Sequence, residues 1–428
     1  MKYIYSFQKP QQHLVDIEII AENINEAVTV IQLPAWRPGR YELGNFAKNI
    51  QKFNVFDRAG KELSFKKITK DRWEVDTKGV KELHIKYNYF ANELNAGSTF
   101  LDEQQFYVNP VNCSVFIPNR IDEKCDVTIV SPWNKRVATG MKREGISESK
   151  NGLYEHKFSI KDYHELADSP FVASDTIKHN MFVLDGVEFH FWFQGECKPE
   201  WAKIINDFFI FINEQFVMMK EFPLTSYNFI FQILPIRFYH GVEHVTSTVI
   251  GLGPGYGIMH GDIFDDLLGV SCHELFHVWN VKTIRPVEMH PYDYTKENYS
   301  RTGYVYEGAT TYYGDLILYR SGVFSDDDYF KTFNQRLQLH FDNFGRTNMS
   351  VADSSFDTWL DGYVPGIPNR KTSIYHEGSL ISFMLDMIIR KNSEGKNSLD
   401  HVMRELYYEY AKKDKGYTAE DYKNIVEK

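Results

Sequence analysis

The sequence predicts a multidomain α+β protein, in which a β-sandwich-like domain at residues 1–175 precedes a mainly helical domain at residues 176–428. The first observation behind this prediction is the length of 428 residues, which exceeds what one ordinary hydrophobic core supports. The second is that apolar and polar residues alternate with a period of two in the first part of the chain. The third is that apolar residues recur at helical spacing through most of the last part.

Short strands make up the predicted N-terminal domain. Three segments alternate in hydrophobicity and are separated by turn signals, namely residues 13–19, 52–57 and 83–89. Short strands at such spacing are typical of a sandwich-like domain. This part of the sequence contains no catalytic constellation.

A segment of mixed structure follows, and helices come after it. Residues 181–184 and 187–193 flank Asp185-Gly186, a strong two-residue turn signal, and so predict a hairpin. The remaining predicted elements are a helix at 201–219, a strand at 227–234, and helices at 262–280, 306–321, 326–341, 374–391 and 399–411.

Composition and charge exclude several classes of function. The net charge of −10, without any run of Lys and Arg, offers no basic face to a nucleic acid. No window of about 18 apolar residues predicts an integral membrane segment. No signal peptide is visible at the N-terminus, and the four cysteines form no Cys-x-x-Cys pair, so we expect a cytoplasmic protein. The glycine-rich residues 251–261 lack the Lys-Ser/Thr ending of a phosphate-binding loop.

The strongest chemical signal is the segment His273-Glu274-Leu275-Phe276-His277. Two histidines four residues apart lie on one face of a helix, so both imidazoles can bind one zinc ion. The intervening Glu274 would lie beside the metal and can accept a proton from water. The alternative is a buried helix with two histidines that hydrogen-bond within the protein. The pattern favours one Zn²⁺ per chain and a hydrolytic reaction.

A catalytic zinc ion needs a third protein ligand, and two glutamates downstream are candidates. Glu297 follows His277 by 20 residues and lies in a polar, loop-like stretch. Glu307 follows it by 30 residues and opens a predicted helix with an apolar face. We favour Glu307, because a rigid element holds a ligand better than a loop does. Glu297 then reads as a solvated loop acid.

Two motifs together resemble the glycyl aminopeptidase family, zinc metallopeptidases of the gluzincin group whose catalytic domain is related to aminopeptidase N. They are His273-Glu274-x-x-His277-x-Trp279-Asn280-x-Lys282-x-Ile284-Arg285-Pro286 and Tyr306-Glu307-Gly308-x-Thr310-x-Tyr312-Tyr313. The resemblance covers most of residues 175–428 and, more weakly, the N-terminal part. It implies a thermolysin-like catalytic domain and assigns Glu307 as the third zinc ligand. Members of this family continue into a C-terminal PDZ module, which is absent from this chain.

The resemblance also points to a catalytic tyrosine and to an amine-binding glutamate. Tyr375 lies in Ser373-Ile374-Tyr375-His376-Glu377-Gly378 and matches the tyrosine that stabilises the transition state in these enzymes. A phenol O–H can donate to the oxyanion that forms when water attacks a peptide carbonyl. Gly241 and Glu243 lie in His240-Gly241-Val242-Glu243-His244, which resembles the Gly-x-Met-Glu-Asn segment of aminopeptidase N. There the glutamate binds the free α-amino group of the substrate, although Val242 and His244 depart from that pattern.

Several residues near the zinc motif are weaker candidates for a role in the site. Thr311 and Asn280 are candidates for hydrogen bonds to the metal-binding histidines. Lys282 and Arg285 follow the zinc helix and could bind a substrate carboxylate or cap the helix C-terminus.

The sequence therefore predicts a zinc-dependent aminopeptidase that acts on peptides. The resemblance implies a preference for small N-terminal residues such as glycine or alanine. The alternatives are an endopeptidase with the same zinc site and a zinc-stabilised binding protein without turnover. The oligomeric state stays open at this point.

Overall fold

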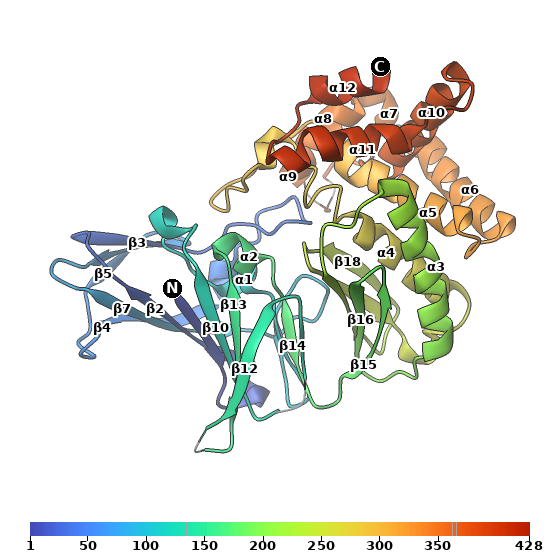
Figure 1. Ribbon diagram of the computed structural model, residues 1–428. Coiled ribbons are helices and arrows are strands. Elements are labelled where there is room, and N and C mark those ends of the chain that lie inside the picture. Colours follow the sequence, from blue (N-terminus) through green and yellow to red (C-terminus); the bar gives the residue numbers. More distant parts are fainter. Residues whose placement is uncertain (134–135, 150, 362, 365) are drawn as a thin grey trace.

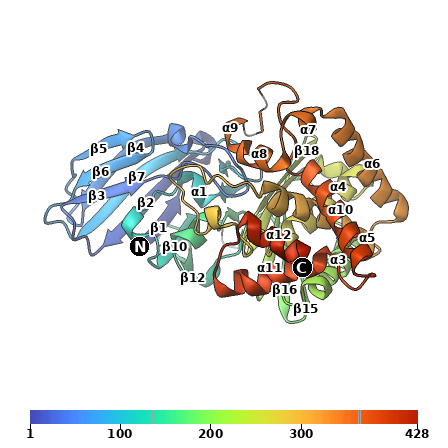
Figure 2. The same ribbon diagram turned by 90° about the horizontal axis from the view of Figure 1, so that it is seen from above.

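A computed structural model describes residues 1–133, 136–149, 151–361, 363–364 and 366–428 (Figure 1). Sheets form the N-terminal half, whereas helices surround one further sheet in the C-terminal half. The predicted α+β architecture is confirmed. The two halves lie side by side in both views (Figure 2).

A seven-stranded sheet is the largest part of the N-terminal half, and its strand order is β12-β13-β10-β1-β2-β7-β4. Every second side chain of β2 is buried, as the period-two pattern predicts. The bounds in this sheet are β1 (Lys2–Ser6), β2 (Leu14–Glu22), β4 (Ile50–Asp57), β7 (Glu82–Phe90), β10 (Cys125–Ser131), β12 (Lys142–Glu148) and β13 (Tyr154–Ile160).

Two smaller sheets complete this half. They have the orders β3-β6-β5 and β11-β14-β9-β8. Their strands are β3 (Val28–Gln32), β5 (Phe65–Thr69), β6 (Arg72–Asp76), β8 (Phe100–Leu101), β9 (Phe106–Val108), β11 (Val137–Thr139) and β14 (Phe171–Ala173). Two short helices, α1 (Pro110–Cys113) and α2 (Tyr163–Ala167), lie among them.

A five-stranded mixed sheet supports the C-terminal half, with the order β15-β16-β17-β19-β18. Strands β16, β17 and β19 are parallel, whereas β15 and β18 run antiparallel to their neighbours. Strand β18 is therefore an edge strand with one side free. The bounds are β15 (Lys178–Leu184), β16 (Val187–Gln194), β17 (Ser226–Ile233), β18 (Phe238–Glu243) and β19 (Ser247–Gly253).

Helices pack around this sheet and form the upper right of the molecule in Figure 1. Helix α4 lies against β18 and β19 and beside α5. The bounds are α3 (Trp201–Met219), α4 (Gly261–Phe276), α5 (Thr310–Arg320), α6 (Asp326–Asp342), α7 (Gly345–Asn348), α8 (Val351–Phe356), α9 (Thr358–Asp361), α10 (His376–Asn392), α11 (Leu399–Glu409) and α12 (Ala419–Glu427). Among the described residues, no helix combines the length and hydropathy needed to span a bilayer.

Two helix ends differ from the sequence prediction at the point where function is expected. Helix α4 ends at Phe276 rather than at residue 280, because Val278 and Trp279 donate to carbonyls three residues back and tighten the turn. The helix predicted from 306 begins instead with a π-helical turn, η6 (Tyr304–Ala309). Hydrophobic periodicity cannot register such local changes in winding.

The two halves share a core and a loop. Tyr292 and Trp359 of the C-terminal half pack into the hydrophobic cluster of the N-terminal sheets. In the loop after β3, the indole of Trp36 donates to the Asp293 carbonyl at 2.7 Å, and the Ala35 amide donates to the Tyr294 carbonyl at 2.7 Å. This loop therefore lies against the C-terminal half.

Candidate active site

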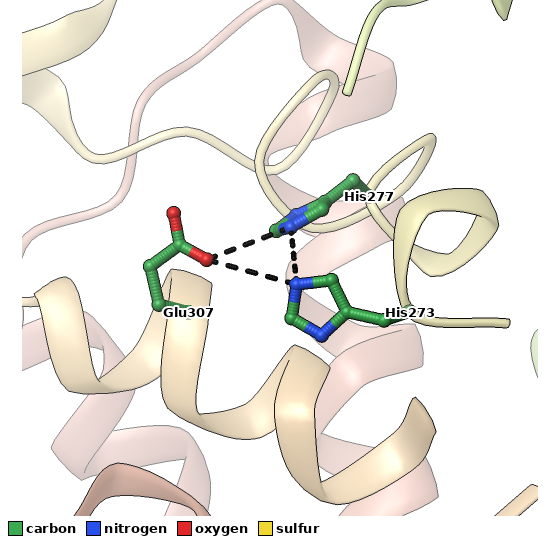
Figure 3. Close-up of side chains that lie close together, drawn as sticks. All are labelled: His273, His277 and Glu307. Atoms are coloured by element: carbon green, nitrogen blue, oxygen red, sulfur yellow. Dashed lines mark hydrogen bonds and ion pairs between the residues drawn. The ribbon is translucent and has the colours of Figure 1, made fainter. Parts of the chain in front are cut away.

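The end of helix α4 brings two imidazoles together. His273 Nε2 and His277 Nε2 lie 3.0 Å apart, and Glu307 Oε2 lies 3.9 Å from the first and 3.5 Å from the second (Figure 3). A tetrahedral zinc ion with bonds of about 2.0–2.1 Å sets its ligand atoms roughly 3.3–3.4 Å apart. The three observed distances bracket this value. The two histidines and Glu307 therefore have the spacing of a metal-binding set.

The hydrogen bond of His277 Nδ1 determines the tautomer of this imidazole, and so leaves Nε2 as the nitrogen with a lone pair toward the cluster. His277 Nδ1 lies 2.7 Å from the backbone carbonyl of Asn280 and must donate to it, which leaves the lone pair on Nε2. The Asn280 side chain in turn donates to the Thr310 hydroxyl at 3.0 Å, and Thr310 donates to the Asn280 carbonyl at 3.1 Å. Asn280 thus contacts a metal-facing histidine, as considered from the sequence. Thr310, rather than Thr311, completes the contact.

Glu307 reaches the histidines from the π-helical turn η6. Single π-turns occur frequently at functional sites, because the extra residue in the turn redirects the side chains around it. Glu307 is 2% exposed, and its second oxygen, Oε1, accepts a hydrogen bond from Tyr41 at 2.6 Å. Glu297 does not belong to either of the metal-capable groups found among the described residues.

A third and a fourth carboxyl group lie beside this cluster. Glu274 and Glu243 are both buried, and each has an oxygen that accepts no hydrogen bond from any described residue. Oxygens of these two groups and a nitrogen of His277 lie within 4.8 Å of one another. Gly241 lies directly against Glu274, and Gly39, with φ of +80°, lies directly against Glu243. A Cβ at either glycine would come within 3.0 Å of the facing carboxylate.

Burial has opposite effects on the acids and bases of this cluster. It raises the pKa of Glu274 and of Glu307 well above the usual range, and the neighbouring Glu243 raises both further. It lowers the pKa of His273 and His277. Neutral imidazoles and a carboxyl group in this arrangement are suited to a divalent cation, which would compensate for the buried negative charge.

Tyr375 lines the same cleft, just before helix α10. Its hydroxyl lies 3.1 Å from the hydroxyl of Tyr363. The cleft has a volume of about 910 Å³, and its lining includes Gly39, Arg40, Gly241, His273, Glu274, Thr311, Tyr363 and Tyr375. The cleft therefore brings together His273, Glu274, Gly241 and Tyr375 of the predicted site. Glu243, Glu307 and His277 are buried beside them, as members of the same two groups of close ligand atoms.

Lys282 and Arg285 have structural contacts. The Lys282 side chain is fully buried, and its ammonium lies 2.8 Å from Asp168 Oδ1. The same oxygen lies 3.1 Å from His244 Nδ1. Lys282 therefore does not reach a substrate carboxylate in the cleft. Arg285 Nε donates to the carbonyls of Val281 and Lys282, in the turns that follow α4 rather than at the last carbonyls of the helix itself.

The N-terminal residues in the cleft escaped the sequence prediction. Gly39, Arg40 and Tyr41 belong to the segment Trp36-Arg37-Pro38-Gly39-Arg40-Tyr41, which follows the third strand. No catalytic constellation was predicted in the N-terminal part, yet Gly39 and Arg40 of this loop line the cleft and Tyr41 contacts Glu307. A Pro-Gly turn between two aromatic residues was the available signal, but nothing in it indicates which distant helix it meets.

Comparison with protein families identifies the chain. A model described as the Peptidase M61 N-terminal domain matches residues 2–175, and a model described as M61 glycyl aminopeptidase matches residues 266–381. The chain belongs to the M61 glycyl aminopeptidase family. As a member of this family, it is a peptide hydrolase. The resemblance drawn from the two sequence motifs is confirmed.

Solved structures of metallopeptidases share the fold of this M61 chain. An aminopeptidase N family protein from Idiomarina loihiensis has a TM-score of 0.90 at 27% identity, covering 99% of this chain and 72% of that one. An M1 zinc metallopeptidase from Deinococcus radiodurans has a TM-score of 0.57 at 13% identity, covering 100% of this chain and 89% of that one. No curated protein matches the chain.

Proposed function

We propose that the chain is a zinc-dependent aminopeptidase that removes small N-terminal residues, glycine or alanine, from peptides. The observation that carries this proposal is the convergence of His273 Nε2, His277 Nε2 and Glu307 Oε2 at the spacing of a tetrahedral metal site. These three residues would hold one zinc ion. When bound, zinc supplies a Lewis acid for the scissile carbonyl and lowers the pKa of water.

Glu274 is the proposed general base. Its carboxylate takes a proton from the attacking water as the C–O bond forms, and then gives that proton to the leaving amine as the C–N bond breaks. Burial and the neighbouring acids raise the pKa of Glu274, which favours a carboxyl group that carries the proton between the two steps. Its oxygen without a hydrogen-bond partner among the described residues is available for water.

Tyr375 is the proposed donor to the oxyanion. Its phenol lies in the cleft that His273 and Glu274 line, 3.1 Å from the Tyr363 hydroxyl and within hydrogen-bonding reach of Glu307. A hydroxyl group that donates to a developing negative charge forms a stronger, charge-assisted hydrogen bond than one that donates to a neutral phenol. This difference between ground state and transition state is what accelerates the reaction.

Glu243 and Gly241 are the proposed binding site for the N-terminal residue of the substrate. Both lie on the edge strand β18, whose free side can pair with an extended peptide. The buried Glu243 carboxylate, which keeps one oxygen without a partner in the described part of the chain, can bind the terminal ammonium group. A mutant of the Deinococcus radiodurans enzyme has been crystallised with a Tyr-Ser-Ala substrate, and a mutant of a two-domain M1 zinc metallopeptidase with L-tryptophan and L-arginine, which supports recognition of a chain end in this fold.

A preference for small N-terminal residues fits the crowding around Glu243. Gly39 lies directly against the Glu243 carboxylate, so that a Cβ on Gly39 itself would clash with it, and His240 and Tyr363 line the neighbouring cleft. Hydrolysis of glycyl, alanyl, leucyl and phenylalanyl 4-nitroanilides tests this part of the proposal. The first two substrates should give the highest kcat/KM.

Three glutamine variants test the assignment of the carboxylates. Glu274→Gln should retain zinc and lose about 100- to 10,000-fold in kcat, the usual contribution of a general base. Glu307→Gln should lose zinc, as measured by elemental analysis after gel filtration. Glu297→Gln is the matched control, because it makes the same charge change in a loop outside the metal-capable groups, and it should retain both zinc and activity. Unchanged hydrolysis by Glu274→Gln would contradict the catalytic assignment.

A further inference from the structure

One side chain of the N-terminal half donates a hydrogen bond to a proposed ligand of the metal site. Tyr41 lies in the loop between β3 and the following helical turn, and its hydroxyl donates to Glu307 Oε1 at 2.6 Å. The other oxygen of the same carboxylate, Oε2, is the one that faces His273 and His277. The two oxygens of Glu307 therefore have different partners.

The Tyr41 side chain is held rigidly. It is 2% exposed, and its ring contacts the rings of Tyr306 and Trp359 at centroid distances of 5.4 and 5.9 Å. The loop that carries it is tied to the C-terminal half by the hydrogen bonds of Trp36 and Ala35 described above. A phenol with this little freedom can fix the orientation of a carboxylate.

A hydrogen bond to Oε1 restricts the rotation of the Glu307 carboxylate. With Oε1 held by Tyr41, Oε2 is the oxygen that faces His273 and His277. A zinc ion held by these residues would therefore meet Glu307 through Oε2.

We infer that Tyr41 is a positioning residue of the metal centre, which holds Glu307 as a ligand through a single oxygen and so makes zinc retention depend on the N-terminal half. The inference rests on the metal site of the proposed function. It goes beyond that proposal by adding a residue from a part of the chain that bears none of the proposed ligands or catalytic groups.

Zinc affinity of the full chain tests the inference. Tyr41→Phe removes one hydroxyl and keeps the ring contacts. Its zinc dissociation constant, measured by competition with a chromogenic chelator, should rise about tenfold to hundredfold, the usual effect of losing such an outer hydrogen bond. The matched control is Tyr163→Phe, which removes a hydroxyl of equal hydrogen-bond length, 2.6 Å to the Ser114 carbonyl, in the same half but away from the cleft. The control should bind zinc as tightly as the unaltered protein.

Two further readouts separate positioning from loss of fold. Circular dichroism and thermal unfolding of the metal-free variants should be the same for Tyr41→Phe and Tyr163→Phe. The visible spectrum of the cobalt-loaded protein reports coordination number, and it should change only in Tyr41→Phe. Equal zinc affinity and equal cobalt spectra for the two variants would overturn the inference. Failure of the unaltered protein to bind zinc would instead overturn the proposed metal site.

Discussion

Gly241 lies against the carboxylate of Glu274, and an added Cβ would come within 3.0 Å of Glu274 Oε1. The contact joins the edge strand β18 to helix α4, the two elements that carry the proposed amine-binding and catalytic groups. Gly241→Ala should therefore displace Glu274 rather than unfold the protein. We expect kcat to fall about hundredfold, since small displacements of a catalytic group have effects of that size.

The control for this variant is Gly269→Ala. Gly269 lies on α4 and lines the same cleft, but a Cβ there meets nothing within 4 Å. It should leave kcat unchanged and stabilise the helix by about 0.5–1 kcal/mol. Both variants should retain zinc, which elemental analysis checks. Full activity in Gly241→Ala would show that Glu274 tolerates displacement and would count against its role.

Zinc binding should release protons. In the metal-free protein, burial and neighbouring acids raise the pKa of Glu307 and Glu274, whereas burial lowers the pKa of both histidines. The carboxyl groups therefore bind protons that zinc must displace, and the imidazoles do not. Zinc affinity should therefore rise as the pH rises above the ordinary titration range of a carboxyl group. Calorimetry in buffers of different ionisation enthalpy measures the protons released, and a pH-independent affinity would contradict the prediction.

The same shifts make a prediction about stability. A carboxyl group whose pKa is raised on folding binds more protons in the folded than in the unfolded state, so metal-free stability should fall as pH rises above the unfolded value of about 4.3. Zinc should reverse this trend, because it replaces the protons.

The Asp168–Lys282 pair should stabilise the junction between the two halves. Asp168 follows helix α2 in the N-terminal half, and Lys282 follows the zinc helix. Burial raises the pKa of Asp168, but Lys282 and His244 outweigh it, and the pKa lies well below the usual range. Asp168→Asn leaves the Lys282 ammonium buried without a counter-charge and should cost about 3–5 kcal/mol in the free energy of unfolding.

Denaturant unfolding at several pH values measures this effect. The pKa of Asp168 is lowered on folding. Its ionised form therefore contributes fully to the free energy of unfolding at pH values above the unfolded-state pKa of about 3.9, and this contribution is lost as the pH falls further. The exposed pair of Lys412 and Glu221 provides the control, and Glu221→Gln should change stability by less than about 1 kcal/mol. Equal effects of the two substitutions would contradict the role given to Asp168.

The fold prediction was based on local sequence patterns, namely hydrophobic periodicity and turn signals. The alternating segments appear as β2, β4 and β7, and the Asp185-Gly186 turn joins β15 to β16, with both residues at positive φ. Helix α3 has the predicted bounds, because an apolar stripe with helical spacing and its ends are all local features. The boundary at residue 175 and the roles of the individual site residues stay predictions.

Contacts between distant parts of the chain could not be predicted from the sequence. His273 and His277 share a helix, so four-residue spacing alone brings them together. Tyr41 and Glu307 are 266 positions apart, and their contact depends on how two domains pack. Thr310 likewise contacts Asn280 across 30 positions, just after the π-helical turn η6.

The measurement that tests the central claim most directly compares hydrolysis of a free peptide and its N-acetylated form by the zinc-loaded protein. Glu243→Gln provides the variant, and Glu93→Gln, at the exposed rim of the same cleft, provides the control. The unaltered protein and the control should cleave only the free peptide, and Glu243→Gln should lose at least about thirtyfold in kcat/KM on it, because a buried ion pair with the amine is lost. Equal cleavage of both peptides by the unaltered protein would contradict an aminopeptidase and indicate an endopeptidase.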